Sequence, residues 1–139
     1  MAGASKGTQR CGIERTYAGN TESVHHARED LGQWLASMDL APLTADAQLV
    51  LSELSSNAVE ASPHLEYSVC VSVEDGRLRI AVSNSSTALL PAERDWKSPD
   101  PLASQGRGLS IVDALSESVE VEQTASIVTV SAHLRTEMP

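Results

Sequence analysis

A change in the spacing of apolar residues is the feature that most restricts how this 139-residue chain can fold. Between Thr21 and Ala61 the apolar residues recur every three or four positions, whereas from Tyr67 onwards they alternate with polar residues. The first spacing is typical of amphipathic helices, and the second of strands with one buried face. Pro63 separates the two patterns, so the chain has to place helices against a sheet.

Two helices are predicted in the first part of the chain, over residues 21–38 and 44–61. Pro42 separates them, and Thr44 is expected to cap the second helix at its N-terminus. A short strand is predicted before them, over residues 11–18. The apolar stripe of the second helix consists of Ala47, Val50, Leu51, Leu54, Ala58 and Ala61.

Strands are predicted in the second part, over residues 67–73 and 78–82, and Asp75-Gly76 between them favours a hairpin turn. Two more strands are predicted near residues 119–121 and 128–134, with a turn between them. The element order predicts an α+β fold, a two-layer sandwich in which helices cover one face of a mostly antiparallel sheet.

One domain is expected from the length, since domains have roughly 150 residues. We expect residues 1–10 to be a flexible tail and residues 11–136 to form the domain. Periodicity disappears between residues 84 and 107, where several prolines occur. Loops of that length in a compact domain usually have a function, so a lid loop is expected there.

The formal net charge of −9 excludes several classes of ligand. Nucleic-acid binding requires clustered cations, and 3% aromatic residues provide no platform for stacked bases. A basic protein surface suits an acidic chain better. Because no apolar run has the length of a signal or a membrane span, we expect a cytoplasmic protein that does not contact a membrane. Cys11 and Cys70 are expected to be buried thiols.

Glu53 and Asn57 are candidate site residues on the second predicted helix. On a helical wheel Asn57 lies at the rim of the apolar stripe, and Glu53 lies one turn away on the same side. An amide oxygen at such a rim can bind a hard cation, and a carboxylate can orient or deprotonate a hydroxyl group. Spacing alone, however, more often marks an ordinary solvated helix edge, formed here by Glu53, Asn57 and Glu60.

A second candidate site opens the next predicted helix with Gly106, Arg107, Gly108 and Leu109. Glycines let the backbone approach a ligand closely, and a helix N-terminus offers free N–H groups. Arg107 adds a cation, so an anion such as a phosphate group fits this segment. A lone Gly-x-Gly is more often a tight turn from a loop into a helix.

Together and in this order, the two motifs resemble those of the GHKL ATPases. Residues 49–61, LVLSELSSNAVEA, resemble the N box of that superfamily, in a form similar to that of the small bacterial anti-sigma factor serine kinases. Residues 106–115, GRGLSIVDAL, resemble its second glycine box. The resemblance covers residues 10–135 and implies the Bergerat, or histidine-kinase-like ATPase, fold.

This resemblance implies an ATP site between the second helix, the sheet and the lid. By position, Asn57 would ligate a Mg²⁺ ion that bridges the phosphates, and Glu53 would be the base that orients the attacking hydroxyl. Residues 106–109 would close on the phosphates, and Ser126 would lie near the adenine.

The resemblance also implies a function and partners. The substrate in this group is a serine of an anti-anti-sigma (antagonist) protein, and the rival partner is a sigma factor that is held inactive. A kinase of this kind regulates transcription by switching between the two partners. Dimers are usual among such kinases, so a homodimer is one expected state.

The chain departs from the family pattern at Asn84. The family has an Asp here, followed by glycines, and its carboxylate accepts a hydrogen bond from the exocyclic amine of adenine; this chain has Asn84 and no such glycines. An amide oxygen accepts more weakly, and the NH₂ group needs a partner of its own. Two hypotheses follow: an ATP-dependent serine kinase, or a degenerate module of the same fold that binds a sigma factor or antagonist with little or no ATP turnover.

Overall fold

A computed structural model describes residues 12–62, 64–85, 111–124 and 126–136 of the chain. Its elements are β1 (Ile13–Tyr17), α1 (Thr21–Ser37), the 3-10 helix η2 (Ala41–Leu43), α2 (Thr44–Ala61), β2 (Tyr67–Glu74), β3 (Arg77–Ser85), β4 (Ser118–Gln123) and β5 (Ile127–Arg135). Residues 111–115 form a further short helix. Within these residues the α-helices and strands follow the predicted order, and η2 is an additional element that the sequence did not predict.

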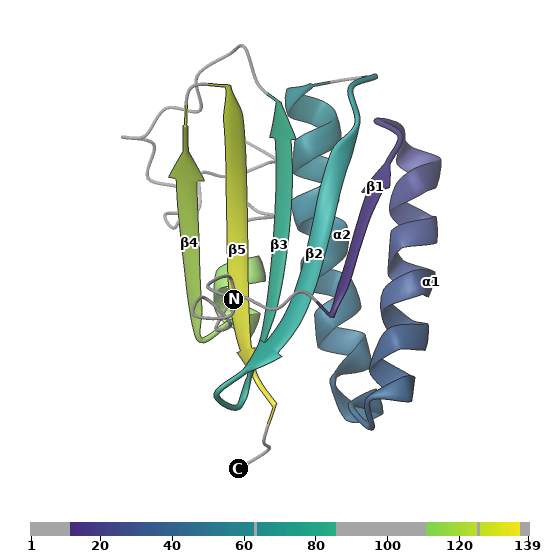
Figure 1. Ribbon diagram of the computed structural model, residues 1–139, viewed down its shortest axis with the longest axis vertical. Helices are drawn as coiled ribbons and strands as arrows, with labels where there is room; N and C mark the ends of the chain where they lie inside the picture. The colour runs from purple at the N-terminus through teal and green to yellow at the C-terminus, as the bar shows by residue number, and fades with distance from the viewer. Residues whose placement is uncertain (1–11, 63, 86–110, 125, 137–139) are drawn as a thin grey trace, which may run out of the picture.

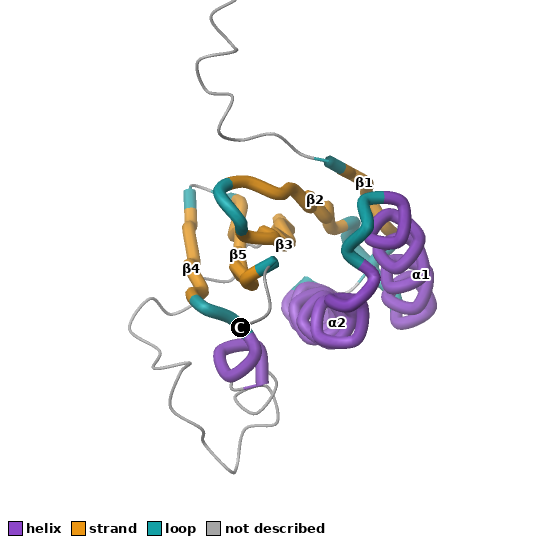
Figure 2. Tube along the Cα trace, turned by 90° about the horizontal axis from the view of Figure 1, so that it is seen from below, coloured by secondary structure: helices purple, strands orange, loops and turns teal. Residues whose placement is uncertain are grey.

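The five strands form one sheet in the order β1-β2-β3-β5-β4, and every neighbouring pair is antiparallel. Both long helices lie on the same face of this sheet (Figures 1 and 2). The predicted α+β sandwich is therefore confirmed. The insertion of β5 between β3 and β4 was not predicted, because alternation shows which face of a strand is buried and not which strand is its neighbour.

The core lies between this sheet and the helices. From α2 it takes Ala47, Val50, Leu51, Leu54 and Ala58. From the central strands it takes Val69, Val71, Leu78, Ile80 and Val82. Burying a large aliphatic side chain stabilises the fold by roughly 1.5–3 kcal/mol, so this packing holds α2 firmly against the sheet. Residues at the rim of α2 consequently have fixed positions relative to the end of β3.

The hairpin between β2 and β3 turns at Asp75 and Gly76, as predicted. Their φ angles are 53° and 73°, the left-handed values that a type I′ turn requires at both central positions. The carbonyl oxygen of Gly76 accepts hydrogen bonds from the backbone N–H and the Oγ1 hydroxyl of Thr136, both at 3.0 Å. The turn is thereby attached to the residue that follows β5.

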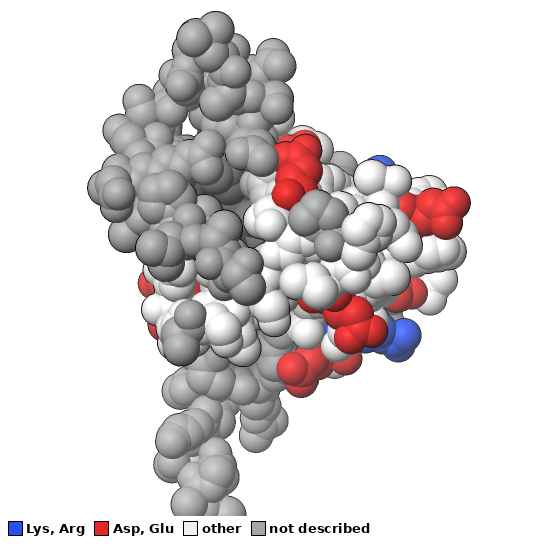
Figure 3. Space-filling model, turned by 90° about the horizontal axis from the view of Figure 1, so that it is seen from above, with Lys and Arg blue, Asp and Glu red and all other residues white. Residues whose placement is uncertain are grey.

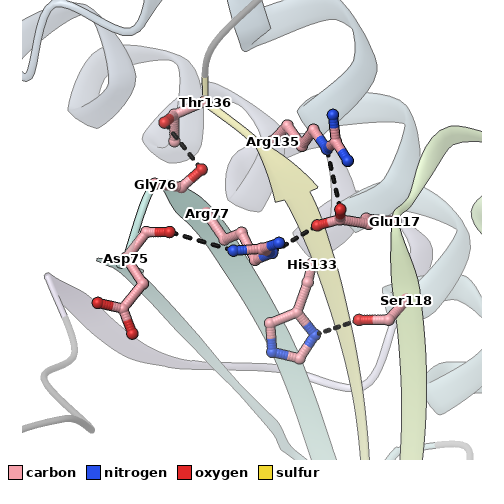
Figure 4. A network of polar contacts seen from close by, with 8 residues as sticks. All are labelled: Asp75, Gly76, Arg77, Glu117, Ser118, His133, Arg135 and Thr136. Atoms are coloured by element: carbon pink, nitrogen blue, oxygen red, sulfur yellow. Dashed lines mark hydrogen bonds and ion pairs between the residues drawn. The ribbon is translucent and has the colours of Figure 1, made fainter.

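An ion-pair network at the same end of the sheet joins β3, β5 and the start of β4 (Figure 4). The Glu117 carboxylate accepts hydrogen bonds from Nε of Arg77 at 2.5 Å and from Nε of Arg135 at 2.9 Å. These two arginines lower the pKa of Glu117 below its usual value. The network supports the register of three neighbouring strands on the face of the sheet that α1 and α2 leave uncovered.

Four details differ from the sequence predictions. Ala61, which the predicted apolar stripe of α2 included, is exposed at the end of that helix. Thr44 does not cap α2, because η2 runs directly into that helix and Leu43 takes the N-cap position without a side-chain hydrogen bond. The predicted lid begins too early, since Asn84 and Ser85 still pair with β5 as part of β3. Cys70 is half-buried and disulfide-bonded, so the prediction of a buried free thiol at this position is wrong. Cys11 lies outside the described residues.

Among the helices that the structure describes, none combines the length and the apolar character needed to cross a membrane.

Candidate functional site

Helix α2 places Glu53 and Asn57 at the boundary between its buried and exposed faces. Leu54 and Ala58, the residues that follow them, are buried in the core, whereas Glu53 and Asn57 are half-buried. One helical turn, about 6 Å along the axis, separates the two side chains. A carboxylate and a carboxamide therefore lie on one side of α2, at the edge of the core.

The Asn57 side chain contains a buried polar atom without a partner. Its Nδ2 atom is inaccessible to solvent and has no hydrogen bond among the described residues. Leaving such a group unsatisfied costs about 1–3 kcal/mol, which a folded protein usually avoids unless the site has a use for it. The unsatisfied atom is a nitrogen and is not itself a metal ligand, but the oxygen of the same carboxamide is the kind of ligand that Mg²⁺ accepts. The residues present fit the expected Mg²⁺ and ATP in this respect.

Asn84 lies at the end of β3, on the face of the sheet that the helices cover. Its Nδ2 atom donates hydrogen bonds to Oγ of Ser62 and to the carbonyl oxygen of Ser85, both at 3.2 Å. The Ser62 hydroxyl in turn donates to the same Ser85 carbonyl at 2.5 Å. The NH₂ group of Asn84 therefore has the hydrogen-bond partners that it needs and that the sequence alone did not identify.

Ser126 lies at the same end of the sheet as Asn84. Strand register places Asn84 opposite Val128 of β5, and Ser126 comes two residues before Val128, just before β5 begins. Ser126 is exposed, so its hydroxyl is accessible to a ligand at this end.

Tyr67 lies beside Asn84 on the neighbouring strand and was not predicted from the sequence as part of this region. Its ring is 1% exposed, and its hydroxyl lies 2.8 Å from Oγ of Ser23 on α1. Burial raises the pKa of Tyr67, so the phenol is neutral at physiological pH. Tyr67 is thus part of the packed core next to Asn84.

Gly106, Arg107, Gly108 and Leu109 lie outside the described residues, so the structure does not place them. The description resumes at Ile111, in the short helix 111–115. Val112 in this helix is completely buried in the same core as Ala58 and Val82. The helix lies on the same side of the sheet as α2 (Figure 2). The segment that follows the glycines is thus anchored close to the site helix.

The described surface at this end of the molecule is acidic. Figure 3 looks onto the end where α2 and β3 finish, and red carboxylate side chains are prominent among the described residues, with little blue. Such a surface repels a triphosphate, so binding needs compensating cations. Arg94, Lys97 and Arg107 belong to the segment in which the sequence predicts a lid, and they lie outside the described residues; a bound metal ion would supply further positive charge.

The structure brings four of the predicted site residues to one region. Asn57 lies five residues before Ser62, about 7.5 Å along the axis of α2, and Ser62 contacts Asn84. Glu53 lies one turn farther from the end of the helix, and Ser126 lies beyond Val128 at the same sheet end. Ser62 was missed, because a serine before Pro63 indicates only where a helix ends.

Comparison with protein families identifies the class. Residues 17–132 match the model of the histidine kinase-like ATPase domain. Because this match covers most of the chain, the protein belongs to that family, within the GHKL ATPase superfamily. Membership of an ATPase domain family implies that the chain binds ATP. No curated protein matches the sequence.

Solved structures share the fold at low sequence identity. A chain with the RsbU and RsbW domains of Rv1364c from Mycobacterium tuberculosis has a TM-score of 0.63 at 20% identity, and the match covers 88% of this chain but only 32% of that one. The blue-light activated histidine kinase EL346 of Erythrobacter litoralis has a TM-score of 0.51 at 20% identity, covering 69% of this chain and 46% of that one. Histidine kinase AdeS of Acinetobacter baumannii has a TM-score of 0.57 at 11% identity, covering 99% and 74%.

Proposed function

We propose that this protein is an ATP-dependent serine kinase that phosphorylates an anti-anti-sigma protein and that also binds a sigma factor, so that it regulates transcription by partner switching. The observation that carries the proposal is the pairing of an unsatisfied, buried carboxamide at Asn57 with a carboxylate at Glu53, one turn away on the same side of α2. A solvated helix edge has no reason to bury an amide without a partner.

Asn57 would hold the metal and Glu53 would act on the substrate. The Asn57 oxygen is a suitable ligand for Mg²⁺, which when bound neutralises phosphate charge. Glu53 then orients the serine hydroxyl and accepts its proton as the oxygen attacks the terminal phosphorus and the bond to the leaving ADP breaks. Positioning and charge compensation suffice for this chemistry, so few catalytic groups are needed.

The choice of partners rests on two supports. Residues 49–61 have the N-box form found in small anti-sigma factor serine kinases, and the fold is similar to that of a chain with an RsbW domain. The acidic charge of −9 also favours a protein partner over nucleic acid. A cytoplasmic location, a lid over residues 86–107 and a homodimer belong to the same proposal.

Asn84 supports a second candidate, a degenerate module that binds partners with little or no ATP turnover. A neutral amide accepts a hydrogen bond from adenine more weakly than a carboxylate does. The hydrogen bonds from its NH₂ group favour the kinase, however, because they leave Oδ1 without a partner among the described residues and able to accept. An Asn84→Asp variant separates the two candidates: the kinase binds Mg·ATP with Asn at this position, whereas the degenerate module gains binding only with Asp.

A phosphate-transfer assay tests the proposal. Wild-type protein, labelled ATP, Mg²⁺ and a candidate anti-anti-sigma protein are combined, and phosphoserine is measured. Glu53→Gln is expected to bind Mg·ATP normally and to transfer phosphate about 10²–10⁴ times more slowly. Asp46→Asn, on the exposed first turn of the same helix, is the matched control and transfers at the wild-type rate. Undiminished transfer by Glu53→Gln contradicts the role of Glu53.

A further inference from the structure

Ser62 is the first residue beyond α2 and lies buried between that helix and the end of β3. It is 6% exposed, and its backbone N–H bonds to the carbonyl oxygen of Ala58 at 3.0 Å. Its φ and ψ angles of −141° and 74° are not helical, as expected for a residue that precedes a proline. This conformation directs the Ser62 side chain to the end of β3, where its hydroxyl meets Ser85 and Asn84.

The three polar groups here permit only one orientation of the Asn84 amide. A serine hydroxyl has a single hydrogen, and Ser62 uses it on the Ser85 carbonyl oxygen at 2.5 Å. Towards Asn84, Ser62 therefore offers only a lone pair, and the Ser85 carbonyl also offers only lone pairs. The Asn84 atom that lies 3.2 Å from both must be the donor, Nδ2. Oδ1 consequently points away from this pair of acceptors.

We propose that Ser62 is a positioning residue that selects the nucleobase. It holds Asn84 with an acceptor directed outward, so the site takes a purine with an exocyclic amine and rejects one with an exocyclic oxygen. This inference rests on the proposed binding of ATP at Asn84.

An amide needs this support, whereas a carboxylate in its place would not. A carboxylate presents an acceptor in either orientation, but an amide turned by 180° exchanges its acceptor for a donor. A turned Asn84 would donate to the 6-oxo group of hypoxanthine and repel the amine of adenine. Sites built on a specific hydrogen bond discriminate strongly against the mismatched partner. Ser62 therefore matters only because residue 84 is an asparagine.

The test compares ATP with ITP, two nucleotides whose bases differ at the 6-position, by calorimetric titration in the presence of Mg²⁺. Wild-type protein is expected to bind ATP roughly ten- to hundredfold more tightly than ITP. Ser62→Ala removes one of the two acceptors that hold Nδ2 of Asn84 and is expected to lower this ratio roughly two- to tenfold, and Ser62→Thr, which keeps the hydroxyl, is expected to restore it. Ser85→Ala is the matched control and leaves the ratio unchanged, because Ser85 acts through its backbone carbonyl.

A double variant isolates the mechanism. In an Asn84→Asp background the ATP preference is expected to be the same with and without the Ser62→Ala substitution, since a carboxylate needs no orienting group. A purely structural role for Ser62 would instead lower ATP and ITP affinity together in both backgrounds.

The outcomes separate this inference from the proposed function. If wild-type protein binds neither nucleotide, the proposed function is wrong and base selection is wrong with it. If ATP binds but wild-type protein favours ITP, or binds both equally, only the orientation assigned to Asn84 is wrong, and this result does not depend on any variant folding. An unchanged ratio in folded Ser62→Ala also contradicts base selection alone.

Discussion

Asn57 is the residue at which the proposed function and the stability of the fold would make opposite demands. Its Nδ2 atom is buried and has no hydrogen bond among the described residues, and such an atom contributes nothing to folding that an alanine would lack. Sites that bind ligands often retain groups that are unfavourable for the folded state. The sequence identified Asn57 as a rim residue, but only the three-dimensional surroundings reveal that its amide is unsatisfied.

Asn57→Ala is therefore expected to leave the melting temperature unchanged or slightly higher while weakening Mg·ATP binding roughly tenfold or more. Scanning calorimetry measures the first quantity and titration calorimetry the second. Gln48→Ala on the same helix is a useful comparison, because it removes an amide that does bond, from Nε2 to the Arg28 carbonyl oxygen at 3.0 Å. A large fall in melting temperature with unchanged ATP affinity for Asn57→Ala would make Asn57 a structural residue.

At the scale of elements, the ends of the helices could be predicted closely and the arrangement of the strands could not. The apolar stripes together with Pro42 and Pro63 predicted both helices, and the structure has Thr21–Ser37 and Thr44–Ala61. Local sequence contains that information because helical contacts are local. Strand order depends on contacts between distant segments, such as β3 with β5, and the pattern within one strand does not encode them.

The first strand illustrates such a contact. The Tyr17 hydroxyl on β1 donates a 2.6 Å hydrogen bond to Oδ2 of Asp30 on α1 and so links the edge of the sheet to the helix layer. Burial, followed by the bond and charge of Asp30, raises the pKa of Tyr17 above its usual value. Because the pKa of Tyr17 is higher in the folded protein than in the unfolded chain, its hydrogen bond stabilises the fold fully below about pH 10. This stabilisation is lost as the pH rises through the pKa of Tyr17 in the folded protein.

Tyr17→Phe is expected to lower the free energy of unfolding by about 1 kcal/mol at neutral pH, because the pair is only partly buried. The difference between wild type and variant should narrow above about pH 10, where the unfolded phenol ionises first. Urea titrations between pH 7 and pH 11 measure both effects. A difference that widens with pH would show that Tyr17 is ionised in the folded protein.

The opposite end of the sheet has its own pH dependence through Glu117. Arg77 and Arg135 lower the pKa of the Glu117 carboxylate in the folded protein. Glu117 therefore stabilises the fold above its unfolded-state pKa of about 4.3, and this stabilisation is lost as the pH falls through its lower folded-state pKa. Glu117→Gln is expected to lower the melting temperature slightly at pH 7, with a gap to wild type that closes below about pH 4 and in high salt. Thermal scans between about pH 4 and pH 7 measure the difference in melting temperature between the variant and wild type. A difference that does not depend on pH or salt would exclude an ionic origin.

At the scale of the whole molecule, residues 17–132 belong to the histidine kinase-like ATPase family, and the site proposed for them is formed by parts that are distant in the sequence. Helix α2 would supply Glu53 and Asn57, the end of β3 would supply Asn84, and Ser126 would come from the residue just before β5. The motifs predicted these residues individually, because each motif is local. They could not show that α2 and β3 are joined through Ser62, since that contact forms only when the helix lies on the sheet.

The central claim is that this end of the molecule binds ATP together with Mg²⁺, and titration calorimetry of the wild-type chain with ATP tests it most directly. With Mg²⁺ present, we expect saturable binding of one ATP per chain in the micromolar range. Chelating the metal should weaken it strongly, because the acidic surface then opposes the triphosphate. Absence of binding at millimolar ATP, or binding that is indifferent to both Mg²⁺ and Asn57→Ala, would contradict the claim.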